Sequence, residues 1–215
     1  MPALQGSRRF RRIIATFALA ALLAACAHLP AVVIPQAVPA SSRLVVFDID
    51  GTLTPTVARI FTARPDASNV ARLYAQRGYR IVYLTARAPA LQGTLRRFLS
   101  HHAFPAGDLL APNSRAEYRA PAAFKARVLE GYRVRGWDIA AAYGDSSSDF
   151  EAYAKVGVPR ERVFALRRVG AAACQPGAWI ACLPGWEQRR AELLGPAATG
   201  DGRRSGRVPV PAPAH

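Results

Sequence analysis

The chain has 215 residues, of which 51% are apolar, and this is enough for one domain with a real core. The formal net charge is +15, and all basic residues except Lys125 and Lys155 are arginines. Such a charge suggests nucleic acid, but the arginines are scattered and are not interleaved with stacking aromatic residues, which argues against that partner. Attraction to anionic lipid or to phosphate groups fits the charge equally well.

The first 25 residues have the pattern of an export signal. Arginines among residues 8–12 precede an apolar stretch at 13–25, which is too short to cross a hydrocarbon core of about 30 Å as a helix. The stretch ends in Leu-Ala-Ala-Cys, which resembles the bacterial lipobox and implies a mature protein that begins at a lipidated Cys26. Ala27 is similar to the signal for outer-membrane sorting. We therefore expect an envelope protein, lipid-anchored at the outer membrane and facing the periplasm; a plain signal peptide or an uncleaved anchor is the alternative.

Composition divides the rest of the chain into three parts. Residues 26–42 contain the lipidated cysteine and a proline-rich stretch without acidic or basic residues other than a histidine, which predicts an extended tether. Residues 43–194 form the predicted catalytic domain. Residues 195–215 are rich in proline, glycine, alanine and arginine, and we expect a disordered tail there.

The two remaining cysteines, Cys174 and Cys182, flank a Pro-Gly turn. In an oxidising periplasm they are candidates for a short disulfide loop, and two unpaired thiols are the alternative. No histidine lies near either cysteine, so we do not expect a zinc site.

Apolar runs alternate with amphipathic stretches through the predicted domain. The runs predict strands at 44–47, 79–86, 108–112, 138–145 and 162–166. The amphipathic stretches predict helices at 66–76, 90–102, 122–134 and 148–156. Such alternation predicts an α/β fold, a Rossmann-like three-layer sandwich with a mostly parallel five-stranded sheet. The connections are too short to hold a large cap domain.

The first strand leads directly into the sequence Asp48-Ile49-Asp50-Gly51-Thr52. Ends of parallel strands lie at the ligand crevice of an open α/β sheet, and residues two apart leave a strand on the same side. Asp48 and Asp50 should therefore meet where ligands bind. Two carboxylates held this close require a cation or a shared proton, and a metal ion with an anionic substrate would satisfy that requirement.

Three further segments bring polar side chains to the same edge of the sheet. Thr85 follows the second strand, Lys125 lies near a helix start, and Asp145 and Asp149 follow the fourth strand in GDSSSD. A carboxylate can attack phosphorus, and a second one can move the proton. A hydroxyl and an ammonium can bind phosphoryl oxygens, and a further carboxylate can complete an oxygen shell around Mg²⁺.

These motifs, in this order, resemble those of the haloacid dehalogenase-like (HAD) phosphohydrolase superfamily. The resemblance implies that Asp48 is the nucleophile, that Asp50 is the general acid and base, and that an aspartyl-phosphate forms. It further implies that Thr85 and Lys125 bind the phosphoryl group. By the same resemblance, Mg²⁺ would be bound by Asp48, by Asp145 and by the backbone carbonyl of Asp50. Thr52 and Asp149 would support these ligands.

A narrower resemblance joins DIDGTLT, YLTARA, DLLAP and Phe124-Lys125 to the lipin-type domain of phosphatidate phosphatases and of relatives of phosphatidylinositol-transfer proteins. Lipin-type domains usually carry an asparagine-rich GN-x-x-x-D motif, whereas this chain has GDSSSD. The departure leaves the substrate open. Phosphatidate or a related membrane phospholipid is the leading candidate, and the missing cap and the expected anchor agree with it.

Two other functions remain open from the sequence, a catalytically weak lipid-binding module and a nucleotide or polynucleotide phosphatase. Several residues are not assigned to the site. Arg87 either touches substrate or is a solvated loop arginine. Trp179 and Trp186 either pack on the sheet or lie at a membrane interface, and we favour packing.

Overall fold

The computed structural model of the chain describes residues 29, 32–39 and 42–195. Its centre is a six-stranded parallel sheet with the strand order β3-β2-β1-β4-β5-β6. The strands are β1 (Arg43–Phe47), β2 (Arg80–Leu84), β3 (Asp108–Leu110), β4 (Asp138–Gly144), β5 (Val163–Leu166) and β6 (Ala181–Leu183). The predicted α/β class and parallel sheet are confirmed, and the sheet has one strand more than predicted.

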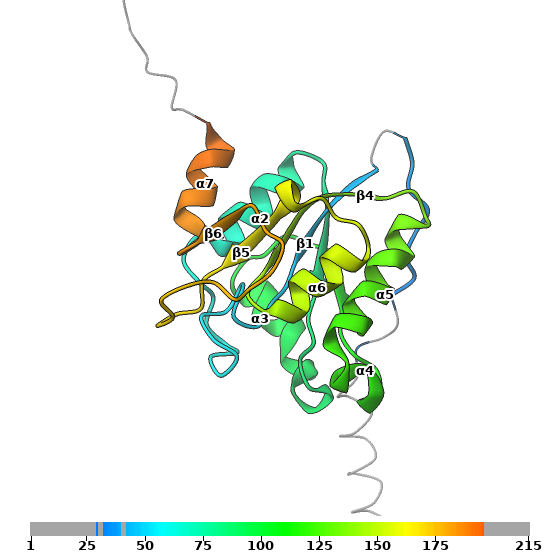
Figure 1. Ribbon diagram of the computed structural model, residues 1–215, viewed down its shortest axis with the longest axis horizontal. Helices are drawn as coiled ribbons and strands as arrows, with labels where there is room; N and C mark the ends of the chain where they lie inside the picture. Colours follow the sequence, from blue (N-terminus) through cyan, green and yellow to red (C-terminus); the bar gives the residue numbers. More distant parts are fainter. Residues whose placement is uncertain (1–28, 30–31, 40–41, 196–215) are drawn as a thin grey trace, which may run out of the picture.

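Helices cover both faces of the sheet and make a three-layer sandwich (Figure 1). The helices are α2 (Ala67–Gln76), α3 (Leu95–His101), α4 (Arg115–Arg119), α5 (Pro121–Arg133), α6 (Ser147–Lys155) and α7 (Trp186–Leu194), with 3₁₀ turns η1 (Pro89–Thr94) and η2 (Arg160–Arg162). Successive side chains of β1 point to opposite faces. Val45 and Phe47 pack in the cluster of α2, α3 and α7, whereas Leu44 and Val46 pack against α5 and α6.

An aromatic stack supports the carboxyl ends of the central strands. Phe47 of β1 stacks on Tyr143 of β4 with ring centroids 5.2 Å apart, and Tyr143 stacks on Phe164 of β5 at 5.1 Å. The hydroxyl of Tyr143 lies 2.7 Å from that of Tyr74 in α2. Because all four side chains are buried, the ends of these strands are held firmly relative to one another.

Two short helical elements differ from the prediction. The single helix expected at 90–102 is divided into η1 and α3. The loop expected before residue 121 contains α4, where the Ser114 hydroxyl accepts a hydrogen bond from the Glu117 N–H. Within residues 42–195, no inserted cap domain covers the carboxyl edge of the sheet, as the sequence predicts.

The C-terminal part of the domain adds β6 and α7, which the sequence did not predict as elements. Cys174 and Cys182 form a disulfide with Cα atoms 5.8 Å apart, which joins β6 to the preceding loop. Trp186 begins α7, is buried, and donates its Nε1–H to the Thr52 carbonyl at 3.0 Å. The expectation that Trp186 packs on the sheet is thus confirmed.

Part of the stretch expected to form a tether lies against the domain. The Ala37 N–H donates to the Arg135 carbonyl at 2.9 Å, and the Trp137 Nε1–H donates to the Pro35 carbonyl at 2.9 Å. Residues 32–39 therefore contact the segment between α5 and β4. The predicted signal at 1–25, Cys26 and the tail at 196–215 lie outside the described residues. Among the helices of the described residues, none has the length and apolar character needed to cross a membrane.

Candidate active site

The site lies at the carboxyl end of β1, in the middle of the sheet. β1 is flanked by β2 and β4, and the Asp48 N–H continues the ladder by donating to the Tyr143 carbonyl at 3.0 Å. Asp48 is 3% exposed and lines a cavity of about 330 Å³. The first predicted carboxylate therefore lies where open α/β sheets bind their ligands.

Lys125 contacts two of the predicted carboxylates. It lies in the first turns of α5, and its Nζ donates to Asp48 Oδ1 at 2.7 Å and to Asp149 Oδ1. The lysine and both carboxylates are buried. The structure thus brings together three residues that are up to 101 positions apart in the sequence.

Asp149 fixes the turn between β4 and α6. Its Oδ2 accepts hydrogen bonds from the Asp145 N–H at 3.2 Å, the Ser146 N–H at 3.1 Å and the Ser146 hydroxyl at 2.7 Å. Ser146 and Asp149 form a capping box at the start of α6. Both carboxylate oxygens of Asp149 are therefore engaged, which agrees with its predicted supporting role.

Asp145 has one strong partner and one weak one. Arg168, just after β5, donates its Nε–H to Asp145 Oδ2 at 2.5 Å. The Thr52 hydroxyl lies 3.5 Å from Asp145 Oδ1, at the outer limit of a hydrogen bond. Arg168 is a residue that the sequence did not point to, because it is one of 27 arginines and lies in no motif.

Asp50 is bound by the residues that follow β2. The Thr85 hydroxyl donates to Asp50 Oδ2 at 2.7 Å, and the Arg87 guanidinium donates its Nη2–H to Asp50 Oδ1 at 2.6 Å and its Nε–H to both oxygens. Arg87 is buried and is not a solvated loop arginine. Thr85 thus contacts the second aspartate, and in this structure it does not line the cavity that contains Asp48.

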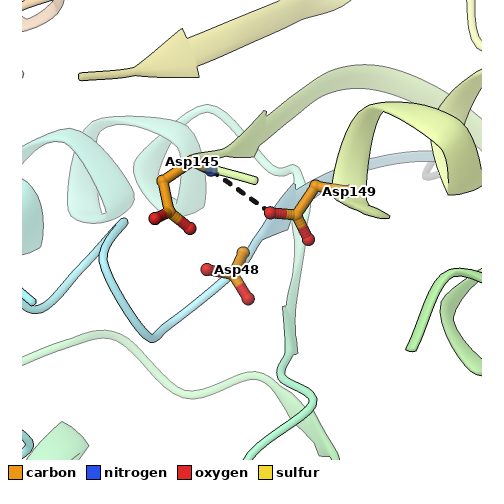
Figure 2. Close-up of side chains that lie close together, drawn as sticks. All are labelled: Asp48, Asp145 and Asp149. Carbon is orange, nitrogen blue, oxygen red and sulfur yellow. Dashed lines mark hydrogen bonds between the residues drawn. The ribbon is translucent and has the colours of Figure 1, made fainter. Parts of the chain in front are cut away.

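The carboxylates of Asp48, Asp145 and Asp149 face one another from the ends of β1 and β4 and the start of α6 (Figure 2). One oxygen from each lies within 4.8 Å of the others. Asp48 Oδ2 is buried and has no hydrogen-bond partner. A hard divalent cation takes carboxylate oxygens as ligands, so a buried oxygen without a donor beside Asp145 fits a metal ion such as Mg²⁺.

The electrostatics of this cluster also favour an added cation. Burial raises the pKa of Asp48 well above its ordinary value, and the charge of Asp149 raises it further, while Lys125 opposes both. Burial would lower the pKa of Lys125, but the charges of Asp149 and Asp48 outweigh that effect and raise the pKa of the ammonium. When all three carboxylates are ionised, they share one ammonium and the guanidinium of Arg168, so one negative charge is left to be compensated by a cation or by a proton on Asp48.

The turn after β1 passes very close to Asp145. Gly51 has φ of +88°, and a Cβ built there would lie 2.2 Å from Asp145 Oδ2. Only glycine fits such a position without strain. Buried Arg64 holds the turn in place, since its Nη2–H donates to the Gly51 carbonyl at 2.6 Å and to the Arg167 carbonyl at 2.8 Å. Arg64 is a second residue that no sequence pattern indicated.

The cavity brings the predicted residues together with apolar neighbours. Asp48, Asp50, Lys125 and Asp145 line it, whereas Thr52, Thr85 and Asp149 lie behind them. The remaining lining comes from five segments: Val57, Ile60, Ala86, Arg87, Ala88, Leu91, Tyr118, Pro121, Ser146, Ser148 and Arg168. The arrangement offers a carboxylate, an ammonium and a guanidinium to an anionic group that enters.

A family model described as the LNS2 domain of PITM 1-3 matches residues 45–167, more than half of the chain. This chain belongs to the LNS2 domain family. The match runs from within β1 to the end of β5 and includes every predicted catalytic, phosphate-binding and metal-binding residue, whereas the predicted lipidation site Cys26 lies before it. It confirms the resemblance to lipin-type domains that the motifs indicated.

Three relatives show how widely this LNS2 domain is shared. Protein retinal degeneration B of Drosophila melanogaster is 32% identical over 137 residues, which is 62% of this chain and 11% of the relative. Human membrane-associated phosphatidylinositol transfer protein 3 is 30% identical, covering 60% and 13%. Phosphatidate phosphatase PAH1 of Arabidopsis thaliana is 29% identical, covering 61% and 17%. The chain thus spans less than a fifth of each relative.

Solved structures confirm the HAD-like fold. A HAD-like protein from Mesorhizobium loti superimposes with a TM-score of 0.50 at 20% identity, covering 77% of this chain and 88% of that one. A chain of the Pnkp1/Rnl/Hen1 RNA repair complex gives 0.51 at 17% identity, covering 70% and 48%. At such identities the likeness concerns the fold alone.

Proposed function

We propose that this LNS2 domain is a Mg²⁺-dependent phosphomonoester hydrolase that works through an aspartyl-phosphate on Asp48. The observation that carries the proposal is the state of Asp48 in the cavity: Lys125 holds Oδ1, while Oδ2 has no partner. A carboxylate that only stabilised the fold would be expected to have both oxygens engaged, as Asp149 has.

The proposed reaction has two displacements at phosphorus. An oxygen of Asp48 bonds to phosphorus, the bond from phosphorus to the ester oxygen breaks, and the leaving oxygen takes a proton from Asp50. Water then attacks the acyl phosphate, Asp50 takes a proton from that water, and inorganic phosphate leaves. In the structure, Arg87 and Thr85 orient the Asp50 carboxylate at the cavity wall. To give its proton to the leaving oxygen, Asp50 has to enter the first step protonated, with one oxygen released from these donors.

Mg²⁺ would be held by Asp48 and Asp145, with the backbone carbonyl of Asp50 as the further ligand that the HAD resemblance implies. When bound, the ion neutralises charge on the phosphoryl oxygens and on the carboxylates around them. Lys125, near the start of α5, supplies a second positive charge beside Asp48. Asp149 keeps Lys125 and the Asp145 turn in place.

Phosphatidate or a related phospholipid is the proposed substrate. Support comes from the relative named as phosphatidate phosphatase and from the cavity, whose apolar lining residues Val57, Leu91 and Tyr118 could contact acyl chains. The lack of an inserted cap among the described residues leaves room for a substrate that stays partly in a membrane.

The test compares phosphate release from p-nitrophenyl phosphate and from phosphatidate vesicles, each with Mg²⁺ and with a chelator. We expect release from both that depends on Mg²⁺ and disappears in Asp48→Asn. Unchanged release by Asp48→Asn would refute the mechanism. Release from p-nitrophenyl phosphate but not from phosphatidate would refute the substrate alone.

A second candidate function is lipid binding without turnover. The family match favours this candidate, because the matching model describes the LNS2 domain of PITM 1-3. Two of the reported relatives are named membrane-associated phosphatidylinositol transfer protein 3 and protein retinal degeneration B, and neither name describes a phosphatase. Stoichiometric binding of phosphatidate by the unaltered chain, without phosphate release in the presence of Mg²⁺, would support this candidate. The complete set of Asp48, Asp50, Lys125 and Asp145 favours catalysis.

For the location, we propose a cell-envelope protein that is anchored at the outer membrane by a lipid on Cys26 and faces the periplasm. The Cys174–Cys182 disulfide supports an oxidising compartment. The mass of the protein purified from membranes tests the anchor, which requires an acylated N-terminal cysteine at position 26. Recovery of Cys26→Ser in the same membrane fraction as the unaltered protein would contradict it.

A further inference from the structure

Large exposed apolar side chains line the cavity at Asp48 or directly follow lining residues in the sequence. Val57, Leu91 and Tyr118 line the cavity and are nevertheless 66%, 46% and 44% exposed. Phe61, which is 65% exposed, follows the lining residue Ile60, and Val169, 60% exposed, follows the lining residue Arg168. We call Val57, Phe61, Leu91, Tyr118 and Val169 the apolar rim.

The apolar rim is assembled from four separate parts of the chain. They are the loop after β1, the turn η1, the helix α4 and the loop after β5. Each part follows the carboxyl end of a strand or lies on the connection from one, so the rim surrounds the edge where Asp48 lies. Figure 1 shows α4 and the loop after β1 along the same lower edge of the sheet. Exposed apolar groups that converge from four segments on one edge mark an interaction surface.

The charge of the same four segments has one sign. Their exposed or half-exposed arginines include Arg59, Arg115, Arg119 and Arg168. Across residues 55–63, 86–97, 113–120 and 167–173 the one acidic residue is Glu117, and its carboxylate is paired with Arg127. Arg168 is paired with Asp145, whereas no ion pair is found for Arg59, Arg115 or Arg119 among the described residues. A surface that joins aliphatic and aromatic groups to such arginines complements an anionic lipid interface, where side chains meet acyl chains and phosphates together.

We propose that the apolar rim docks on an anionic lipid bilayer, so that the catalytic cavity opens directly onto the membrane. The partner is the lipid surface itself, distinct from the single phosphomonoester that enters the cavity. A polynucleotide fits less well, because single strands are bound by stacking aromatics along a basic groove. Phe61 and Tyr118 are the two aromatic residues of the rim, and the other three are aliphatic and cannot stack. The inference extends the proposed function but does not need turnover.

The path of the N-terminal segment agrees with this orientation. Leu29 lines a second cavity together with Asn113 and Glu117, beside α4. Cys26 is three residues earlier, a distance of at most about 10 Å in an extended chain. The lipid proposed on Cys26 would thus enter the membrane near the edge that bears the apolar rim.

The test uses tryptophan as a depth reporter in the full-length chain. Phe61→Trp reports from the apolar rim, and Val134→Trp is the matched control. Both native side chains are about equally exposed, at 65% and 67%. Val134 follows the C-terminus of α5, whose first residue Pro121 lines the cavity, so the control lies about 20 Å from it along that helix.

Fluorescence is measured with phosphatidylglycerol vesicles that contain lipids brominated on their acyl chains. After subtraction of the unaltered protein, we expect bromine quenching of Phe61→Trp at least about threefold stronger than that of Val134→Trp. Equal quenching at the two positions, or quenching at Val134→Trp alone, would overturn the proposal. Phosphatidylglycerol carries no phosphomonoester, so binding in the catalytic cavity cannot account for the signal.

A second measurement tests the contribution of the rim. The double variant Phe61→Ser/Val169→Ser should lower the fraction of protein bound to these vesicles at least about fivefold. The control Val134→Ser should leave this fraction unchanged. Thermal unfolding of each variant verifies that it is folded. Unchanged vesicle binding by the double variant would contradict the proposal. A change in the fluorescence of Phe61→Trp on adding a single-stranded oligonucleotide, but not on adding vesicles, would also contradict it. In Asp48→Asn the quenching should persist, which separates failure of docking from failure of the phosphatase proposal.

Discussion

Lys125 is the residue on which the charge balance of the site depends. Its ammonium is the one cation that contacts both Asp48 and Asp149 among the described residues. We expect Lys125→Met to lower kcat for p-nitrophenyl phosphate at least about 100-fold, because a preorganised positive charge at the phosphoryl group is lost. The exposed Lys155 supplies the matched control, and Lys155→Met should leave kcat unchanged. Equal rates for the two variants would remove Lys125 from the mechanism.

Arg168 neutralises Asp145 from outside the cluster, and it is expected to compete with a metal for that carboxylate. Arg168→Gln should therefore lower the Tm in the presence of a chelator but increase the rise in Tm on adding Mg²⁺, since the freed Asp145 binds the ion more tightly. Thermal unfolding across a Mg²⁺ titration measures both effects. An unchanged or smaller response to Mg²⁺ would indicate that Arg168 does not compete for Asp145.

The raised pKa of Asp48 predicts how stability depends on pH in the metal-free protein. Burial, followed by the charge of Asp149, raises this pKa in the folded state, so the folded protein binds the proton more tightly than the unfolded chain does. The stability of the metal-free protein should then fall as pH rises from about 4 towards the folded pKa. Asp48→Asn removes this loss and should be more stable than the unaltered protein at pH 7 in a chelator, with a smaller difference at pH 4. Denaturant unfolding measures it, and lower stability of Asp48→Asn at pH 7 would contradict the account.

The positions of the acidic residues and Lys125 at strand ends or near a helix start, together with the HAD resemblance, predict one shared site, and the structure brings these side chains together there. The same reasoning could not find Arg64 or Arg168. Arg64 binds a backbone carbonyl and Arg168 binds the carboxylate of Asp145, and both partners come near only when the chain folds. In addition, a single arginine is a weak signal in a chain that contains 27 of them. Thr85 was placed at the correct strand end, but its contact with Asp50 came from the structure.

At the scale of elements, the turn after β1 couples the first and fourth motifs. Gly51→Ala would place a Cβ against Asp145, whereas Gly78→Ala, at φ of +79°, would meet nothing within 4 Å. Both substitutions carry the strain of a left-handed conformation, about 1 kcal/mol, so Gly78→Ala measures that strain alone. We expect Gly51→Ala to destabilise by about 1–3 kcal/mol more and to lower activity at least about tenfold. Equal effects of the two substitutions would mean that the close approach to Asp145 has no consequence.

Apolar runs identified the four central strands β2, β1, β4 and β5, whose burial on both faces gives a continuous pattern, and the short edge strand β3. The sequence did not predict the nine-residue helix α7 or the two short elements β6 and α4. β6 has three residues, and α4 has five with no buried side chain, so neither has a periodicity to detect. Both are held by the rest of the fold: β6 by pairing with β5 and the disulfide, and α4 by contact with α5.

At the scale of the whole molecule, one edge of the sheet holds both the catalytic residues and the apolar rim. The layers, the strand order and the lack of an inserted cap in residues 42–195 follow from the alternation of elements and from the short connections between them. The rim could not be predicted, since Val57, Leu91 and Tyr118 are ordinary residues in three unrelated segments. Their meeting at the cavity is a property of the fold.

The central claim is that Asp48 accepts the phosphoryl group. The most direct measurement is a rapid acid quench of the full-length protein with phosphorylated substrate and Mg²⁺, followed by peptide mass spectrometry. The account predicts a phosphoryl adduct on Asp48 that hydroxylamine removes, and no adduct in Asp48→Asn. Phosphate release with an adduct at another residue, or release by Asp48→Asn at the rate of the unaltered protein, would contradict it.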